Sequence, residues 1–141
     1  MNIEEQFLAY AAAFEESYED NDWSRVAAFF TEAASYDNGE GDAAHGRDAV
    51  LEKLKGSVDG LDRRMDSRGV EIRSLTIECD TVTMERKARY TKAGLPGLEF
   101  KGTEYARYED GHIAELRDEL VPGSGEVLGA WLDAHGSALA T

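Results

Sequence analysis

The chain has 141 residues, of which 42% are hydrophobic and 31% charged, enough for one domain with its own core over residues 1–141. Fifteen Lys and Arg against 29 Asp and Glu leave a formal net charge of −14. So acidic a surface repels phosphate backbones and anionic lipid headgroups, and we expect no nucleic acid and no membrane as partner. A single cysteine excludes an intramolecular disulfide and a cysteine-based metal cluster, and the first residues have no signal-peptide pattern, which favours a cytoplasmic protein.

The first sixty residues predict three helices and one short strand. Apolar residues recur at helical spacing from the N-terminus, with acidic residues mostly on the other face. The sequence at residues 20–22 breaks this pattern and supplies an N-cap for a second, short helix. A short strand at residues 33–37, a glycine-bearing loop at 38–45 and a third helix at 46–58 follow. The apolar stripe of the first helix comprises Ile3, Phe7, Tyr10, Ala11, Phe14 and Tyr18.

From residue 63 the hydrophobic period changes to two, which predicts an antiparallel sheet. The phase of the alternation slips at Arg73-Ser74, so we expect a bulge in the first of these strands. Three further strands cover residues 82–90, 98–108 and 112–121. The tail at residues 122–141 is amphipathic and predicts a C-terminal helix.

The last hairpin decides which side chains face the inside of the sheet. A two-residue turn at Asp110-Gly111 pairs Tyr108 with Ile113, whereas a three-residue loop with Gly111 in the left-handed conformation pairs Tyr108 with His112. Register follows the buried face, so we expect the three-residue loop, because it gathers the apolar residues on one side. That apolar face contains Phe100, Ala106, Tyr108, Ala114, Leu116 and Leu120.

Three charged residues fall on the apolar faces of the predicted strands. Glu104 and Asp118 lie on that of the last hairpin, and Arg86 lies beside Met84 and Ala88 on the preceding strand. Buried charges are costly unless they are paired. One Arg against two carboxylates leaves an excess acid whose pKa is raised by desolvation, which suits general acid–base catalysis. The same three residues also fit an internal ion-pair network with no catalytic role.

The order of the predicted elements resembles the nuclear-transport-factor-2-like superfamily over nearly the whole chain. Within it, ASYDNGEGDAAHGRDAV at residues 34–50 is similar to the ketosteroid isomerase segment in which a catalytic aspartate precedes a Gly-Arg-Glu-Ala-Ile helix start by nine positions. This resemblance makes Asp37 a candidate base. It also places Glu104 where those isomerases have a protonated aspartic acid that donates to the oxyanion, and Phe14 where they have the tyrosine of the oxyanion hole.

The sequence YEDGHIAE at residues 108–115 resembles even more closely the SnoaL-type polyketide cyclases, whose proline-bearing loop is similar to LPG at residues 95–97. Those cyclases use an aspartate as acid and base, with a histidine two positions before it. Asp118 matches the aspartate, and Leu116 stands at the histidine position. An arginine with two carboxylates also resembles the limonene-type epoxide hydrolases, in which these groups activate a water.

The resemblance implies an α+β fold in which a curved antiparallel sheet wraps around N-terminal helices, with an internal pocket (a cystatin-like cone) and a C-terminal helix. The leading hypothesis is a cofactor-independent isomerase, cyclase or hydrolase acting on a small apolar carbonyl or polyketide-like molecule. Asp118 would be the acid and base, Glu104 its hydrogen-bond partner, Arg86 the electrostatic organiser and Asp37 a second base. The rival hypothesis is a non-catalytic domain that uses the pocket for ligand binding or the sheet for dimerisation.

The remaining expectations concern the pocket wall and the partners. The three scattered histidines have no metal-ligand spacing, so we expect no metal site. The outward face of the sheet, with Thr103, Tyr105 and Ile113 among complementary charges, favours a homodimer, as sheets of the resembled superfamily often pair through that face. The candidate ligand-binding residues are Phe14, Tyr18, Trp23, His45, Met84 and Leu116.

Overall fold

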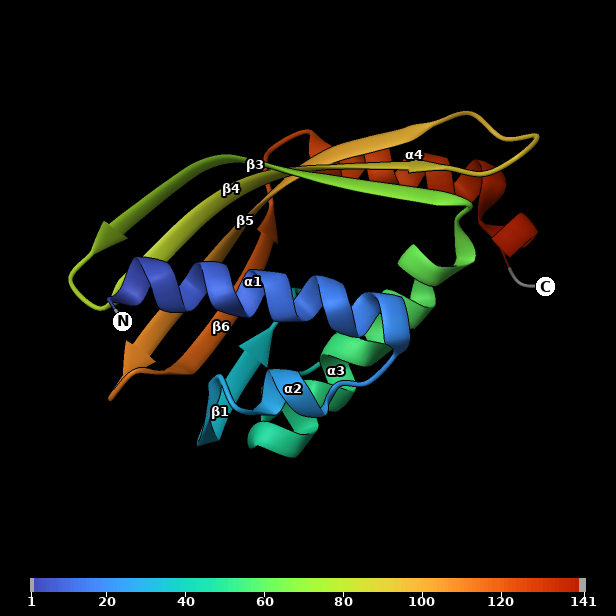
Figure 1. Ribbon diagram of the computed structural model, residues 1–141. Coiled ribbons are helices and arrows are strands. Elements are labelled where there is room, and N and C mark those ends of the chain that lie inside the picture. Colours follow the sequence, from blue (N-terminus) through green and yellow to red (C-terminus); the bar gives the residue numbers. More distant parts are fainter. Residues whose placement is uncertain (1, 140–141) are drawn as a thin grey trace.

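The computed structural model describes residues 2–139, in which helices pack against one six-stranded sheet (Figure 1). The α-helices are α1 (Ile3–Asp20), α2 (Ser24–Ala27), α3 (Arg47–Gly60) and α4 (Ser124–His135), and the 3-10 helices are η1 (Asp62–Arg64) and η2 (Gly136–Leu139). The strands are β1 (Phe30–Asp37), β2 (Ala44–His45), β3 (Ser67–Glu78), β4 (Thr81–Thr91), β5 (Leu98–Glu109) and β6 (His112–Leu120).

Two asparagines determine where α1 begins and ends. Asn2 is its N-cap, because the Asn2 Oδ1 accepts a hydrogen bond from the Glu5 N–H at 2.8 Å. At the other end Asn21 adopts a left-handed φ of 60°, which asparagine tolerates better than most residues. Its N–H donates to the Ser17 carbonyl at 2.8 Å, and the helix ends there.

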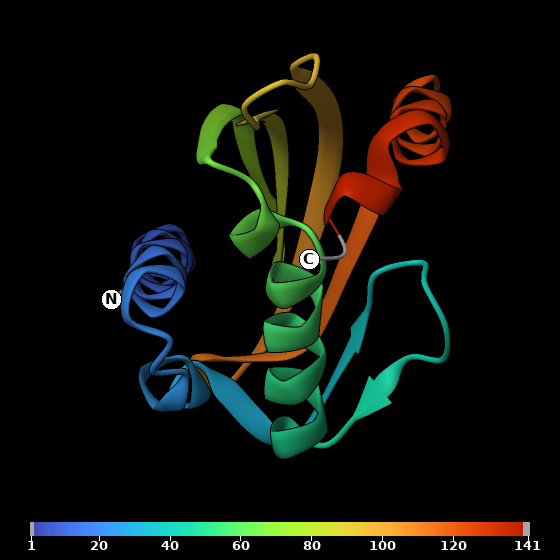
Figure 2. The same ribbon diagram turned by 90° about the vertical axis from the view of Figure 1, so that its right-hand side faces the viewer.

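The strand order in the sheet is β2-β1-β6-β5-β4-β3. Neighbouring strands are antiparallel except for β1 and β6, which run parallel. The sheet curves around α1 and α3, which lie on its concave side, and α4 packs against β5 (Figures 1 and 2). The predicted α+β fold, with a curved sheet around N-terminal helices and a C-terminal helix, is confirmed.

β1 is longer than predicted, and its partner was not predicted. The sequence predicts a strand at residues 33–37 without a partner, whereas β1 begins at Phe30 and runs parallel to β6. The parallel pairing begins directly after α2, where the Ile113 N–H donates to the Phe29 carbonyl at 2.7 Å. Antiparallel pairing holds throughout the four strands after residue 63. The buried residues of β1 are Phe30, Ala34 and Tyr36.

The β5–β6 hairpin has a two-residue turn, so the predicted three-residue loop is wrong. Asp110 and Gly111 both have positive φ, 50° and 81°, which is the combination that a tight type I′ turn requires. Tyr108 therefore pairs with Ile113. The register then shifts by one residue, because Ala114 bulges out of the ladder.

This bulge still brings the predicted side chains to the inner face. Beyond it, Ala106 pairs with Leu116 and Glu104 with Asp118. Compared with a two-residue turn without a bulge, the predicted three-residue loop shifts the pairing by one residue in one direction, and the observed bulge shifts it by one residue in the other. The two registers therefore differ by two residues, and the same residues of β6 face inward in both. Ile113, by contrast, is fully buried and not on the outward face. The bulge predicted in β3 is confirmed, because the pairing with β4 shifts between Ile72 and Ser74.

The buried apolar residues form two clusters, and each α-helix contributes to one of them. The larger lies between α1, α2, α3 and the sheet, and Phe7, Val26 and Val50 are its fully buried members from the helices. The smaller joins α4 and η2 to β4 and β5 through Trp131 and Leu139. Full burial of such a side chain stabilises the fold by about 1.5–3 kcal/mol, so these clusters hold the helices on the concave face.

Candidate active site

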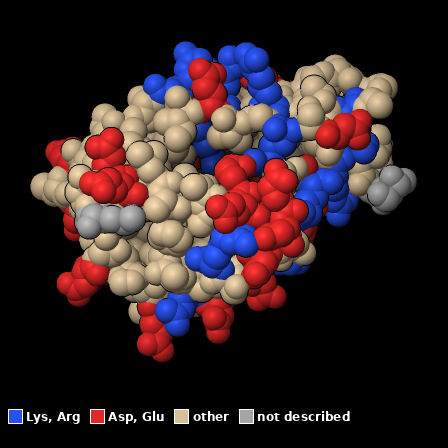
Figure 3. Space-filling model, viewed as in Figure 1, with Lys and Arg blue, Asp and Glu red and all other residues tan. Residues whose placement is uncertain are grey.

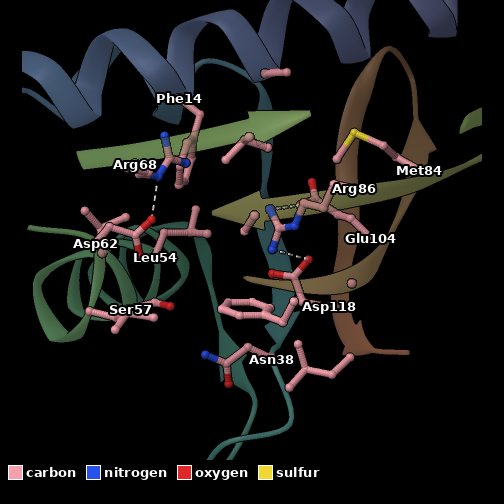
Figure 4. A pocket seen from close by; sticks show the side chains of 18 of the residues that line it. Phe14, Asn38, Leu54, Ser57, Asp62, Arg68, Met84, Arg86, Glu104 and Asp118 are labelled. Carbon is pink, nitrogen blue, oxygen red and sulfur yellow. Dashed lines mark hydrogen bonds and ion pairs between the residues drawn. The ribbon is translucent and has the colours of Figure 1, made fainter. Parts of the chain in front are cut away.

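A cavity of about 810 Å³ lies between the helices and the concave face of the sheet. Side chains from α1, α3 and β3 to β6 line it, and most of them are apolar. Charged side chains gather in two places on its wall, which Figure 4 shows well apart, each with its own ion pair. One of these places holds the three charged residues that the sequence puts on the inner faces of the strands.

Arg86, Glu104 and Asp118 converge from three neighbouring strands (Figure 4). Glu104 on β5 stands directly opposite Asp118 on β6, while Arg86 on β4 stands opposite Gly102. The guanidinium bridges both carboxylates, with Arg86 Nη1 3.3 Å from Glu104 Oε2 and Nη2 3.7 Å from Asp118 Oδ1. Gly102 lets β5 approach β6 closely, because a Cβ there would lie only 3.2 Å from the Glu119 carbonyl oxygen.

Tyrosine hydroxyls complete this group. The Tyr36 hydroxyl, brought by β1, donates to Asp118 Oδ2 at 2.7 Å. Asp118 Oδ1 is buried and accepts no hydrogen bond from residues 2–139. Tyr10 on α1 also lines the cavity, within electrostatic reach of Glu104 and Asp118. We refer to Tyr36, Arg86, Glu104 and Asp118 as the Arg86 cluster.

Burial determines the protonation states in the Arg86 cluster. Glu104 is 6% exposed, and burial together with the Asp118 carboxylate raises the pKa of Glu104 well above its usual range, although Arg86 opposes the shift. Burial and Asp118 also raise the pKa of Tyr36, so its phenol stays neutral and donates. Burial by itself would lower the pKa of Arg86, but Asp118 and Glu104 outweigh it and the pKa is raised.

The cluster therefore combines a cation, a carboxyl group that burial favours in its protonated form, and a second carboxyl group that accepts a hydrogen bond. Arg86 stays charged, and the 30% of its side chain that is exposed faces the cavity. Burial favours the protonated form of Glu104. Asp118 accepts the Tyr36 hydroxyl at Oδ2, and its Oδ1 lies 3.7 Å from the Arg86 guanidinium.

Of the other candidate residues predicted from the sequence, some line the cavity and others do not. Asp37 follows Tyr36 on β1 and points to the opposite side, where its exposed Oδ1 accepts a hydrogen bond from the Gly39 N–H at 2.8 Å. His45 on β2 is exposed and does not line the cavity. Phe14 and Met84 do line the cavity.

Tyr18, Trp23 and Leu116 lie behind the cavity wall and do not line it. The ring of Tyr18 lies 4.6 Å below the Arg68 guanidinium, and Trp23 packs edge-on against Phe14 at 5.3 Å between ring centroids. Leu116 is 1% exposed and belongs to the main core. These three residues support the site by packing.

Tyr36, Asn38 and Tyr10 are cavity residues that sequence reasoning missed. For the first two a signal was present, since alternation along β1 puts Tyr36 and Asn38 on the face opposite to Asp37. Asn38 Oδ1 accepts a hydrogen bond from the Glu40 N–H at 2.9 Å, which leaves the amide NH₂ of Asn38 to donate into the cavity. Tyr10 lies one helical turn before Phe14, so α1 supplies a hydroxyl that Phe14 lacks.

Two further properties of the described chain bear on its function. Among residues 2–139 no three His, Cys, Asp or Glu side chains come together as potential ligands of a metal ion. Within the same residues, no helix is both long and apolar enough to cross a membrane.

Residues 9–116 match the family model of the SnoaL-like domain. A comparison with curated proteins gives no match. Among solved structures, a putative SnoaL-like polyketide cyclase from Jannaschia sp. is 15% identical, with a TM-score of 0.67 over 94% of this chain and 93% of that one.

Two other solved structures share the fold. An NTF2-like protein of unknown function from Burkholderia pseudomallei is 14% identical, with a TM-score of 0.67 over 93% of this chain and 98% of that one. An LEH-like epoxide hydrolase from M. tuberculosis is 20% identical, with a TM-score of 0.61 over 94% of this chain and 96% of that one. At these identities the likeness is one of fold.

Proposed function

This chain belongs to the SnoaL-like domain family, and on that premise we propose that it is a cofactor-independent acid–base enzyme for a small, mostly apolar substrate with a reactive oxygen. The observation that supports this most directly is the pairing of Glu104 with Asp118 across two strands, bridged by Arg86. Burial favours the protonated form of Glu104, while Asp118 accepts a hydrogen bond from the Tyr36 hydroxyl, so a donor and an acceptor face the same cavity.

Each member of the Arg86 cluster has a distinct part in this proposal. Asp118 is the base, and its Oδ1 has no hydrogen-bond donor among residues 2–139 and can take a proton. Glu104 is the acid that gives a proton to the substrate oxygen. Arg86 and Tyr36 hold the Asp118 carboxyl group in place.

Within acid–base chemistry, the surroundings of Asp118 favour the addition of water to an epoxide. Asp118 Oδ1 has no hydrogen-bond donor among residues 2–139 and can accept a proton from a water, and Asn38 offers a further polar group on the same cavity wall. The water oxygen attacks an epoxide carbon, the ring C–O bond breaks, Asp118 takes the water proton, and Glu104 protonates the released oxygen. Because Asp118 and Glu104 are cross-strand neighbours, the proton can then return to Glu104.

The M. tuberculosis neighbour, an LEH-like epoxide hydrolase, is consistent with this reaction. The Jannaschia neighbour, a putative polyketide cyclase, is consistent with a second one, in which Asp118 removes a proton next to a carbonyl and Glu104 donates to its oxygen. Both reactions use the same acid and the same base.

The test is turnover of small apolar epoxides in isotopically labelled water. The expected product is a diol that carries one labelled oxygen, and Asp118→Asn and Glu104→Gln should each lower kcat/KM by roughly 100-fold or more. Tyr105→Phe, on the outer face of the sheet, is the matched control and should leave turnover unchanged.

Two other outcomes contradict water addition. Exchange of α-hydrogens of apolar ketones with deuterium, lost in Asp118→Asn, would assign the carbonyl reaction. Binding of epoxides and ketones without any turnover would show a non-catalytic pocket protein and overturn the enzyme proposal.

We also propose that the protein acts as a homodimer in the cytoplasm. Tyr105 lies on the outer face of the sheet beneath the Arg117 guanidinium, at 4.4 Å from its ring centroid, among charges of both signs. The exposed thiol of Cys79 suits a reducing compartment.

A further inference from the structure

A second set of charged side chains lines the same cavity away from the Arg86 cluster (Figure 4). Arg68 on β3 donates from Nε to Asp62 Oδ2 at 2.5 Å, and both of its terminal nitrogens donate to the Glu15 carboxylate of α1, at 2.6 and 3.2 Å. The Tyr90 hydroxyl donates to the same Asp62 Oδ2 at 3.0 Å. We refer to Glu15, Asp62, Arg68 and Tyr90 as the Asp62 cluster.

The Asp62 cluster leaves one hydrogen-bond acceptor free. Both donors, Arg68 and Tyr90, use Asp62 Oδ2, and Asp62 Oδ1 accepts no hydrogen bond from residues 2–139. The Asp62 side chain is 14% exposed and lines the cavity. With one guanidinium against two carboxylates the cluster has a net charge of −1, so it attracts donors and repels anions.

The spacing of the two clusters is set by β4. Arg86 and Tyr90 face the cavity four residues apart on this strand, which corresponds to about 13 Å. Ala88 is the residue between them on the same face, with Val70 and Phe100 as its neighbours on the adjacent strands. A methyl side chain at this point leaves an apolar passage that connects the clusters.

We propose that the Asp62 cluster is a substrate-binding subsite that selects elongated molecules with an apolar body and an uncharged or cationic hydrogen-bond donor, a hydroxyl or an ammonium, at the end remote from the reacting oxygen. Asp62 Oδ1 accepts the hydrogen bond from that donor, and Ala88 sets the width of the passage. The assignment of the reacting end rests on the function proposed for the Arg86 cluster. Carboxylate and phosphate tails are rejected by the negative charge.

The experiment is calorimetric titration of a homologous series of ketones that carry a terminal hydroxyl at increasing distance from the carbonyl. Simple methyl-terminated ketones and carboxylate-terminated ketones of equal length are the comparison series. The hydroxy ketones should show an optimum in affinity at one chain length, where they bind roughly tenfold more tightly than the methyl-terminated ketone. The carboxylate series should bind more weakly than both at that length.

Asp62→Asn is the sharpest variant, because it keeps the shape of the side chain. The amide oxygen of an asparagine there is needed by Arg68 and Tyr90, so its NH₂ faces the cavity and cannot accept. The hydroxyl preference of roughly tenfold should therefore disappear. Asp59→Asn is the matched control: Asp59 is on α3, pairs with Lys55 and does not line the cavity, so the preference should persist.

Ala88→Leu tests the passage independently and decides the matter if Asp62→Asn does not fold. It should weaken binding of the long hydroxy ketones and leave short ketones unaffected. Equal affinities of hydroxyl- and methyl-terminated ketones at every length overturn the subsite, even if Asp118→Asn abolishes epoxide turnover. A chain-length optimum that Asp62→Asn removes, in a protein that turns over no substrate, supports the subsite and refutes only the proposed catalysis.

Discussion

At the scale of single residues, Glu104 is the least expected feature of the molecule. It is a buried carboxyl group whose closest cation, Arg86, is shared with Asp118. A buried acid of this kind costs stability when it ionises, and it escapes the cost by keeping its proton. The same property makes it a proton donor at neutral pH.

Substitution of Glu104 should reveal this proton in the pH dependence of stability. Since the folded-state pKa of Glu104 is raised, its contribution to stability is complete below the ordinary pKa of about 4.3 and declines as pH rises towards the folded value. Glu104→Gln mimics the protonated acid and removes the decline. The free energy of unfolding of the variant should therefore gain on the parent by up to about 1.4 kcal/mol per pH unit above that point, measured by urea unfolding. Parallel pH profiles for the two proteins would contradict the buried proton.

Arg86→Met should extend the same decline to higher pH. Without the guanidinium, Glu104 and Asp118 face each other as a pair of acids with no cation, and the pair holds a proton to still higher pH. The free energy of unfolding of this variant should keep falling with pH beyond the point at which that of the parent levels off. Arg89→Met, whose residue is exposed on the outer face, is the control and should follow the parent. An unchanged profile in Arg86→Met would show that the three groups do not interact.

The inner charges could be predicted from sequence, while the hydroxyls were missed for identifiable reasons. Glu104 and Asp118 interrupt an apolar alternation, and that contrast is visible without coordinates. Tyr36 fits such an alternation and looked like an ordinary core residue, whereas the family resemblance drew attention to Asp37. Only the parallel pairing of β1 with β6 brings Tyr36 to Asp118, and sequence periodicity contains no information on which strands pair.

At the scale of secondary structure elements, α4 lines the cavity and packs against β5. The Trp131 Nε1–H donates to the Pro96 carbonyl at 2.9 Å, and the Lys101 N–H donates to Ser124 Oγ at 3.0 Å. Trp131 is 7% exposed and joins the smaller core cluster, which includes Ala88 and Tyr90 of β4. The amphipathic pattern of the tail predicted this helix, but it did not indicate that the helix would contact the loop that contains Pro96.

Trp131 variants should separate packing from hydrogen bonding in α4. Trp131→Phe keeps most of the buried area and loses the hydrogen bond to Pro96, so the free energy of unfolding should fall by about 1 kcal/mol beyond the small loss of packing. Trp131→Ala should cost about 3–5 kcal/mol, because it also leaves a cavity. Urea unfolding of both variants measures the difference. Similar losses in the two would show that the hydrogen bond, and not the ring, holds α4.

At the scale of the whole molecule, charge is distributed differently on the two sides of the sheet. On the face shown in Figure 3, acidic side chains gather where α1 lies, with basic ones beside them. On the outer face of the sheet, by contrast, charges of opposite sign pair on neighbouring strands, such as Lys87 with Glu99 at 3.0 Å and Arg107 with Glu115 at 3.6 Å. A face that is neutral in sum can meet a second copy of itself without repulsion, despite a net charge of −14.

The homodimer proposed through this outer face can be measured by light scattering. The mass at micromolar concentration and moderate salt should be that of two chains. Tyr105→Asp should shift it to one chain, because a new negative charge would then face its own copy across the interface. Val127→Asp, on the exposed surface of α4, should leave the dimer intact. A monomer at every concentration would refute the dimer and leave the cavity chemistry untouched.

The bulge at Ala114 has a consequence for how such a pocket can diverge between relatives. The one extra residue at the bulge decides which face of the sheet each later residue of β6 occupies. A deletion there therefore exchanges the β6 side chains that face the cavity with those that face outward. Arg117 would enter the inner face, and Asp118 would leave it. A single codon lost or gained near the tip of this hairpin can thus rewrite the chemistry of the pocket in one evolutionary step, which no single amino-acid replacement achieves. Alignments of this family that score substitutions alone will overlook such transitions.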